Sequence, residues 1–417
     1  MNDQKYDWIV AGAGIAGISI AEILCREGKS VLLIEKNTQI ASETSKVFHE
    51  WLHTGALYSL VPDSLYTTRY LLGAMDDLFE YYGGFERMNL SQTENGISMA
   101  DTGWFNQDYI EYRYKVRKFN PIWMSLVSRA VNISNLINDH DWLRRRAGGS
   151  EYGSSKIKLK YSFDLIHKQL LSNKKFYSIS SPDFTMNSRV LMSDLLGSAL
   201  KNGLEVVTSE AVESIEQASS VVNVVTSGGK YQADNIVICS PDIISKQFNI
   251  PVTTGYAPMA VVENVPEDEK SFVELDYYTK TCINLLKKEN GIGLAGGITV
   301  NKEKEIKPYL DYVIKEHKKR NPGIKVIDDY VGLKRELVQN KEKRNYLYHI
   351  NQHDSKIWSV VLGKFTLAFS MAPEFYRRAY NINPTQACNK DIENIDTNII
   401  SKTSWKEIVD NKKKEIQ

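Results

Sequence analysis

The pattern of hydrophobic and polar residues predicts alternating strands and helices at the start of the chain. An apolar strand at 8–11 leads into an amphipathic helix that ends near residue 26, and a second apolar strand follows at 31–34. This order is typical of a βαβ unit with parallel strands. The alternation returns later, in helices near 64–82 and 188–202, in strands at 204–208, 212–215, 221–225 and 235–239, and in a last strand at 357–362 with a helix that ends near 380.

Two other regions interrupt this alternation. Residues 91–177 are aromatic and basic, and residues 251–325 combine short strand patterns with a charged helix near 306–319. We therefore predict an α/β protein, in which a three-layer Rossmann-like domain with a parallel sheet is interleaved with an α+β substrate domain. The predicted nucleotide domain has parts at 1–90, 181–250 and 329–380, the substrate or cap domain has parts at 91–180 and 251–328, and a polar, lysine-rich tail covers 381–417.

A glycine-rich turn joins the first strand to the first helix. Its spacing is Gly12-x-Gly14-x-x-Gly17, where the glycines permit a tight turn, a close approach to phosphates and close packing of helix on strand. Glu35 ends the second strand, and its carboxylate can accept hydrogen bonds from a ribose diol but would repel a 2′-phosphate. The pattern predicts a dinucleotide bound at the helix N-terminus. The flanking residues of this predicted site are Ile15, Ala16 and Lys36.

Composition excludes several classes of function. The 52 lysines and arginines nearly balance the 51 aspartates and glutamates, so no overall charge attracts nucleic acid or an anionic membrane. The four cysteines form no Cys-x-x-Cys pair, which favours reduced structural thiols over a disulfide framework or a zinc site. No secretory signal is visible, and no apolar run reaches the roughly 18 residues that span a bilayer. We expect a soluble, cytoplasmic protein without a metal site.

Three further segments carry a family resemblance. A serine-rich turn that includes Thr44 and Ser45 precedes the run from His53 to Tyr58, His-Thr-Gly-Ala-Leu-Tyr. A helix, glycine turn, strand and hairpin follow at 193–239, and the last helix is preceded by the sequence Leu-Gly-Lys-Phe-Thr at 362–366. With the glycine motif, these segments resemble the D-amino-acid oxidase family of flavoproteins, in its glycerol-3-phosphate dehydrogenase and L-2-hydroxyglutarate oxidase-like branch.

The resemblance implies FAD as the cofactor. It places the acidic residue Glu35 on the adenosine ribose and the backbone near Val212 at the adenine. It also places the segment with Thr44 and Ser45 under the isoalloxazine ring. The residues expected to touch the pyrimidine and ribityl side of the flavin are Gly363, Lys364, Phe365 and Thr366.

His53 is the predicted catalytic residue. Its imidazole titrates near neutral pH, and the resemblance places it close to the flavin, where it can take a proton from the substrate. Two alternatives stay open, a covalent link to the flavin and a structural histidine. Tyr58 is predicted to contact substrate. Lys334 and Arg335 stand where the family usually has Gly-x-Arg-Pro and are candidates to bind an anionic group, although the proline is missing.

These features predict an FAD-dependent dehydrogenase or oxidase that transfers a hydride from a CH–OH or CH–NH centre of a small polar substrate to flavin N5. A second glycine pattern, at 291–296, lies in strand-like sequence and opens no helix. Reoxidation therefore falls to oxygen, a quinone or a partner protein rather than to a nicotinamide domain. The alternatives are use of reduced FAD without net redox, as in sugar-nucleotide mutases, reduction of a double bond, and a non-catalytic FAD-binding scaffold.

Overall fold

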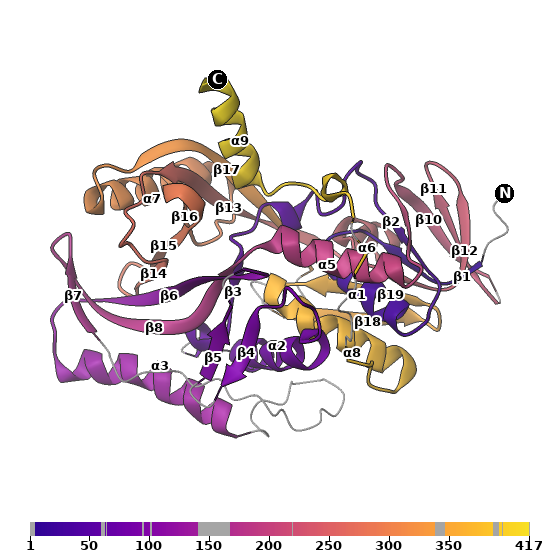
Figure 1. Cartoon of the computed structure of the whole chain (residues 1–417), viewed down its shortest axis with the longest axis horizontal. Helices are drawn as coiled ribbons and strands as arrows, with labels where there is room; N and C mark the ends of the chain where they lie inside the picture. The colour runs from indigo at the N-terminus through magenta and orange to yellow at the C-terminus, as the bar shows by residue number, and fades with distance from the viewer. Residues whose placement is uncertain are drawn as a thin grey trace.

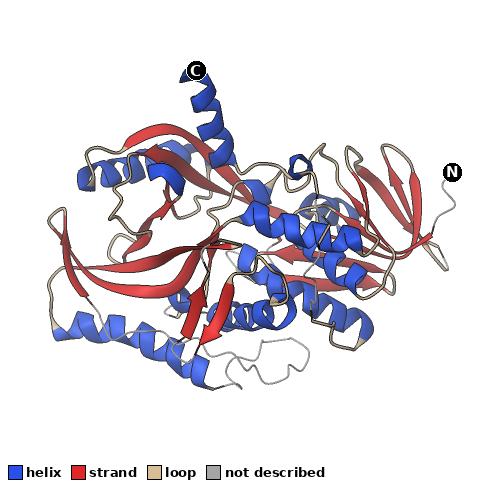
Figure 2. Cartoon of the chain, in the orientation of Figure 1, coloured by secondary structure: helices blue, strands red, loops and turns tan. Residues whose placement is uncertain are grey.

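Two large β-sheets with helices packed against them make up the protein (Figures 1 and 2). The computed structural model of the 417-residue chain describes residues 5–59, 63, 65–93, 96–100, 102–140, 167–218, 220–337, 347–386, 392–393 and 395–416.

The first sheet is mainly parallel at its centre. The order is β10-β11-β12-β1-β2-β9, and β19 adds to it by pairing with the second half of β12 and with β18. β1 is parallel to both β12 and β2, while β10, β11 and β18 run antiparallel to their neighbours. Its strands are β1 Lys5–Ala11, β2 Val31–Ile34, β9 Glu205–Val207, β10 Val212–Gln217, β11 Val222–Thr226, β12 Lys230–Ile238, β18 Tyr348–Asp354 and β19 Ile357–Leu362.

Helices α5 (Ser188–Lys201) and α8 (Ala368–Tyr380) both pack against α1 (Ile15–Arg26) on one face of this sheet. Their isoleucine, leucine and aromatic side chains form the main core with the strands. The β10–β11 ribbon and α6 (Pro241–Phe248) cover the other face through a second apolar cluster. The predicted α/β fold, with its parallel sheet between two layers, is confirmed.

The second sheet is mostly antiparallel and has nine strands, in the order β17-β13-β16-β15-β14-β6-β8-β3 with β7 beside β8. Helix α7 (Ile306–Arg320) covers β13 and β16 through a third apolar cluster. The strands are β3 Trp51–Leu52, β6 Phe105–Val116, β7 His167–Leu171, β8 Lys174–Met186, β13 Val252–Glu263, β14 Phe272–Asp276, β15 Thr281–Lys287, β16 Gly293–Gly297 and β17 Lys325–Leu337.

Smaller elements complete the described part of the chain. They are helices α2 Tyr66–Tyr82, α3 Pro121–Asp139 and α9 Ser404–Ile416, the hairpin β4 Leu90–Thr93 with β5 Gly96–Met99, and the 3-10 turns η1 Thr44–Lys46, η2 Ala56–Tyr58, η3 Glu289–Gly291, η4 Glu303–Glu305, η5 Phe365–Leu367 and η6 Thr397–Ile399.

The chain passes from the second sheet to the first at residues that differ from the predicted domain boundaries at 180 and 328. β8 stays in the second sheet until Met186, and β17 stays there until Leu337, because its backbone pairs with β13 along its whole length. The segments 181–186 and 329–337, predicted for the nucleotide domain, therefore belong to the second sheet. The tail beyond residue 381 also carries a helix, α9, that lies near β17 at the upper edge of Figure 1.

Candidate active site and cofactor cleft

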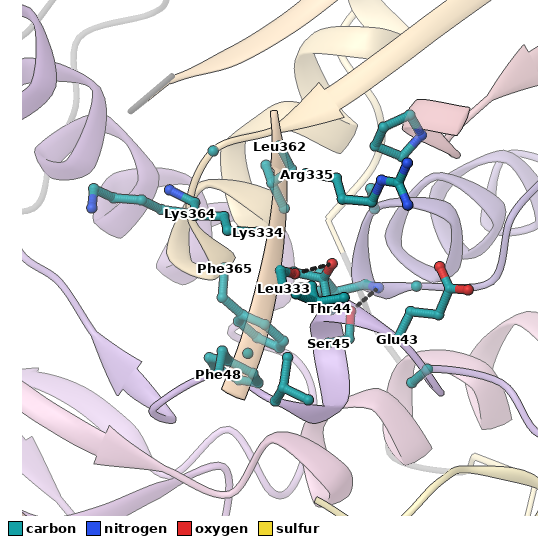
Figure 3. Close-up of a pocket in the computed structure, with 18 of the residues that line it drawn as sticks. Glu43, Thr44, Ser45, Phe48, Leu333, Lys334, Arg335, Leu362, Lys364 and Phe365 are labelled. Carbon is teal, nitrogen blue, oxygen red and sulfur yellow. Dashed lines mark hydrogen bonds between the residues drawn. The ribbon is translucent and has the colours of Figure 1, made fainter. Parts of the chain in front are cut away.

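A cavity of about 460 Å³ is lined by both sheets. Its lining includes the β1–α1 turn, the end of β2 and the residues that follow β12, together with His53, Tyr58 and residues 362–365. β17 and strands β13–β16 contribute one wall, and η1 lies beside β17 (Figure 3). All but two of the predicted site residues line this cavity, although they come from segments far apart in the sequence. The two exceptions are Gly17 and Thr366.

The glycine turn is shaped for close approach. Gly12 has a φ of +106°, a left-handed conformation that favours glycine. A Cβ on Gly17 would lie 1.9 Å from the carbonyl oxygen of Gly12, so a side chain there would push the helix off the strand. At the start of α1, the backbone N–H of Ile15 donates to Ser45 Oγ at 3.0 Å. A small hydroxyl from η1 thus satisfies a helix N-terminal donor that can also face an anion.

The Glu35 carboxylate is held by the backbone at the end of β2. It is buried, and it accepts hydrogen bonds from the N–H of Ala13 at 2.9 Å and of Asn37 at 3.0 Å. These contacts fix its orientation against the cavity, where it can accept from ribose hydroxyls. Lys36 lies outside this contact and forms an exposed ion pair with Glu43 at 2.5 Å.

Residues from the C-terminal part of the chain also line or support the cavity. Thr366 is fully buried, and its hydroxyl accepts a hydrogen bond from the backbone N–H of His53 at 3.0 Å. Phe365 stacks on Phe48, with ring centroids 4.3 Å apart and planes 8° from parallel. Figure 3 shows the Phe48 and Phe365 side chains next to each other. Thr366 therefore holds the His53 segment in place rather than lining the cavity.

His53, the catalytic residue predicted from the sequence, lines the cavity. Its ring lies 4.1 Å from that of Trp51 and 5.6 Å from that of Tyr58, between centroids. Burial holds the pKa of His53 well below its usual range, and the positive charges of Lys364, His49 and Lys334 lower it further. The imidazole is therefore neutral at neutral pH and able to accept a proton.

Two lysines add positive charge beside His53. Lys364 Nζ donates to Tyr58 Oη at 2.7 Å and lies over the tyrosine ring, and Lys334 forms a 2.5 Å ion pair with Glu336. Because successive residues of a strand face opposite sides, Arg335 points away from Lys334 and pairs with Asp242 at 2.6 Å. Figure 3 shows the two lysines directed to the same side and Arg335 to the other. Of the two candidate anchors, Lys334 is thus the one directed to the same side as Lys364.

The structure adds residues that the sequence motifs did not identify. Phe48 stacks in the cavity, Asn284 lines it from β15 with a buried Oδ1, and the buried carboxyl of Asp183 lies behind His53. None of the three belongs to a recognised motif. Phe48 lies in the loop between η1 and β3, and Asp183 and Asn284 come close to the cavity only through the pairing of strands in the second sheet. Among the described residues there is no cluster of three or more potential metal ligands, and no helix is long and apolar enough to cross a bilayer.

Comparison with known proteins decides the family. The model of the DAO family, the FAD-dependent oxidoreductases, matches residues 7–284, well over half of the chain. The chain belongs to this family. It is an FAD-dependent oxidoreductase of the D-amino-acid oxidase type, as its sequence predicted.

Solved structures of other proteins share this fold at low identity. L-α-glycerophosphate oxidase from Mycoplasma pneumoniae with FAD bound is 16% identical, with a TM-score of 0.66 over 93% of this chain and 97% of that chain. L-proline dehydrogenase from P. horikoshii is 12% identical, with a TM-score of 0.61 over 92% of this chain and 96% of that one. Glycine oxidase from Geobacillus kaustophilus is 13% identical, with a TM-score of 0.60 over 93% and 99%.

A UDP-galactopyranose mutase from Mycoplasma pneumoniae is more similar over a short stretch. The two proteins are 41% identical over 59 residues, which is 12% of this chain and 15% of the mutase. The chain thus matches far less than two thirds of that relative.

The residues around the cavity fit FAD. The positive φ of Gly12 and the close contact at Gly17 disfavour side chains in the turn, Glu35 is already fixed by backbone donors, and Ser45 accepts from the N-terminus of the helix expected to face the phosphates. These groups could hold the adenosine diphosphate half, with Val212 beside them in the cavity wall, and residues 363–365 could hold the flavin end.

A side chain at Gly14 is expected to abolish FAD binding. A Cβ there lies 3.3 Å from Ser45 Oγ, and the branches of a valine would extend into the space needed by the pyrophosphate. Purified Gly14→Val protein should lack the flavin band near about 450 nm. A matched control is Gly323→Ala, because a Cβ at Gly323 meets nothing within 4 Å. Full flavin content in Gly14→Val would refute this assignment of the turn.

Proposed function

We propose that this flavoprotein oxidises a CH–OH or CH–NH centre of a small anionic substrate. The observation that supports the proposal is the position of His53, whose imidazole lines the cavity with Lys334 and Lys364. A proton acceptor next to fixed positive charge suits a substrate that carries an acidic group and loses an O–H or N–H proton during oxidation. The residues proposed to act on substrate are His53 as the base, with Tyr58 and Lys334 as binding groups.

The cofactor roles follow the same geometry. We assign the backbone of Gly12, Gly14, Ile15 and Ala16 with Ser45 to the pyrophosphate, Glu35 to the ribose, Val212 to the adenine side, and Thr44, Gly363, Lys364 and Phe365 to the flavin side. When bound, FAD supplies the acceptor for the hydride that leaves the substrate carbon. The chain itself orients the substrate, excludes water from the cavity and removes the proton.

A panel of candidate substrates tests this function. The holoprotein is mixed without oxygen with hydroxy acids, amino acids, polyol phosphates and sugar nucleotides, and the flavin band near about 450 nm is followed. We expect at least one anionic hydroxy or amino compound to bleach the band without an added reductant. Turnover of a sugar nucleotide only after chemical reduction of the flavin would instead support mutase-like chemistry, for which the short match to UDP-galactopyranose mutase is the one observation.

The same panel identifies the electron acceptor. Reoxidation of the bleached protein is timed with oxygen, with a soluble quinone and with neither. We propose that one of these or a partner protein reoxidises the flavin, because the described part of the chain shows no second nucleotide-binding turn: residues 293–297 form strand β16.

Lys334 is expected to bind the substrate anion, and Arg335 is expected to be dispensable for it. A charge-assisted hydrogen bond contributes about 1.5–3 kcal/mol, so Lys334→Met should raise KM by about tenfold to a hundredfold with little change in kcat. Arg335→Met serves as the matched control, because its side chain faces Asp242 on the other side of the strand. Equal KM values for the two variants and the wild type would remove Lys334 from the substrate site.

A further inference from the structure

Asp183 is a buried carboxylic acid next to His53, and it belongs to none of the proposed cofactor or substrate contacts. It lies on β8, where it is fully buried, and β8 pairs with β3 immediately before His53. Asp183 Oδ2 is 3.8 Å from His53 Nδ1. This distance is beyond a hydrogen bond, so a bond between the two atoms requires the imidazole ring to move closer to the carboxyl group.

Four hydrogen bonds are donated to this carboxyl group. Oδ1 accepts from the backbone N–H of Thr54 at 2.9 Å and from its hydroxyl at 2.5 Å. Oδ2 accepts from Trp51 Nε1 at 2.8 Å and from Tyr112 Oη at 2.6 Å. Since every one of these partners is a donor, together they favour the ionised carboxylate.

The imidazole of His53 offers one more donor for that carboxylate. Its Nδ1 is buried and makes no hydrogen bond to any described residue. The ring packs against Trp51 at an interplanar angle of 32°, and the indole N–H of Trp51 is itself bonded to Asp183 Oδ2. Asp183 thus fixes the aromatic surface on which the imidazole rests, and it lies on the Nδ1 side of the ring.

We propose that Asp183 is a positioning residue for His53, in which its carboxylate accepts a hydrogen bond from Nδ1–H and leaves Nε2 as the proton acceptor. This inference rests on the proposed role of His53 as the base. As the substrate O–H or N–H bond breaks, its proton passes to the Nε2 lone pair, and the electron pair of the C–H bond leaves with the hydride to FAD. The imidazolium that forms is then stabilised by the carboxylate behind it.

The charged groups around His53 and Asp183 suit a hydrogen bond between the two side chains. Lys334, Lys364 and His49 raise the positive potential at His53, and Tyr58 and Tyr112 present phenol groups. Burial lowers the pKa of His53 and raises the pKa of Asp183. A carboxylate at Nδ1 opposes part of the lowering, so its removal should make the imidazole a weaker base.

The state of His53 can be measured directly, without a substrate. Histidine labelled with ¹⁵N reports the tautomer and pKa of each of the seven histidines in the holoprotein, and His53→Gln assigns the signal of His53. We expect the Nδ1–H tautomer in the wild type. In Asp183→Asn we expect a pKa lower by about one unit or more and loss of the single tautomer. An Nε2–H tautomer in the wild type, or an unchanged His53 in Asp183→Asn, overturns the proposal.

Two further measurements separate positioning from a structural role. If Asp183→Asn does not fold, Tyr112→Phe is the second variant. It removes one donor to the Asp183 carboxylate, which then becomes more basic. The pKa of His53 should therefore rise, and an unchanged pKa contradicts the proposal.

With a substrate from the panel, Asp183→Asn should slow flavin reduction about tenfold or more and move the acidic limb of the rate profile to lower pH. A slower rate with an unmoved limb indicates only structural damage. If no compound of the panel reduces the flavin, the proposed function is contradicted. The ¹⁵N measurement then still tests the role of Asp183.

Discussion

Replacement of His53 by alanine should lower the rate of flavin reduction by about 10²-fold or more, the usual contribution of a positioned base. FAD should remain bound, because the contacts assigned to the adenosine end lie in the Gly12 turn and at Glu35 rather than at His53. Since the pKa of His53 is held below its usual value of 6.5, the wild-type rate should stay level through that pH and fall only in more acidic solution.

The measurement is single-turnover reduction in the absence of oxygen, with His49→Ala as the matched control. His49 lines the same cavity four residues earlier, and its replacement should have a smaller effect. If His53→Ala is reduced as fast as the wild type, His53 is a structural histidine. Flavin that stays on the wild-type chain after acid denaturation would identify a covalent link instead.

Loss of the charge on Glu50 should destabilise the protein by about 3–5 kcal/mol, the cost of leaving a buried partner charge uncompensated. Glu50 Oε2 accepts hydrogen bonds from Lys288 Nζ at 2.7 Å and from Trp405 Nε1 of α9 at 2.8 Å, and Oε1 accepts from the Ser188 hydroxyl at 2.7 Å. The side chains of Glu50 and Lys288 are 4% and 3% exposed. This carboxylate therefore joins α5, α9 and the second sheet.

Urea unfolding of Glu50→Gln tests this, with Lys46→Ala as the control. Lys46 also reaches α9, through Glu407, but that pair is partly exposed and should contribute at most about 1 kcal/mol. Burial would raise the pKa of Glu50, but Lys288 and the hydrogen bonds lower it below 4.5. Its stabilisation is thus present at neutral pH and is lost as the pH falls through that lowered value. Equal losses in both variants would contradict the role of Glu50.

The periodic elements and the nucleotide turn could be predicted from the sequence. Strand β19, helix α5 and the βαβ unit lie close to their expected positions, because each buries one regular apolar face. The long strands β13 and β17 were not recognised, since consecutive charged residues such as Lys334, Arg335 and Glu336 interrupt the apolar alternation and only the pairing of the two strands makes them continuous. Helix α9 was missed because its lysine-rich sequence has few apolar residues, and Trp405 is the one that packs beside Glu50.

Site residues could be predicted from the sequence only where they belong to a local motif. His53, Glu35 and residues 363–365 come from such motifs and line one cavity. Asp183 and Asn284 come from β8 and β15, and no local pattern marks a residue whose neighbours are set by strand register. The division of Lys334 from Arg335 follows from strand alternation, which becomes visible once β17 is known to be a strand.

The central claim is that the substrate's C–H bond is broken as bound FAD is reduced. It is tested most directly by single-turnover reduction of the holoprotein, without oxygen, by the panel compound that bleaches it and by the same compound deuterated at the donor carbon. We expect bleaching near about 450 nm that is clearly slower with the deuterated compound. It is contradicted if no compound bleaches the flavin, or if turnover occurs only after the flavin has been reduced chemically and shows no such difference.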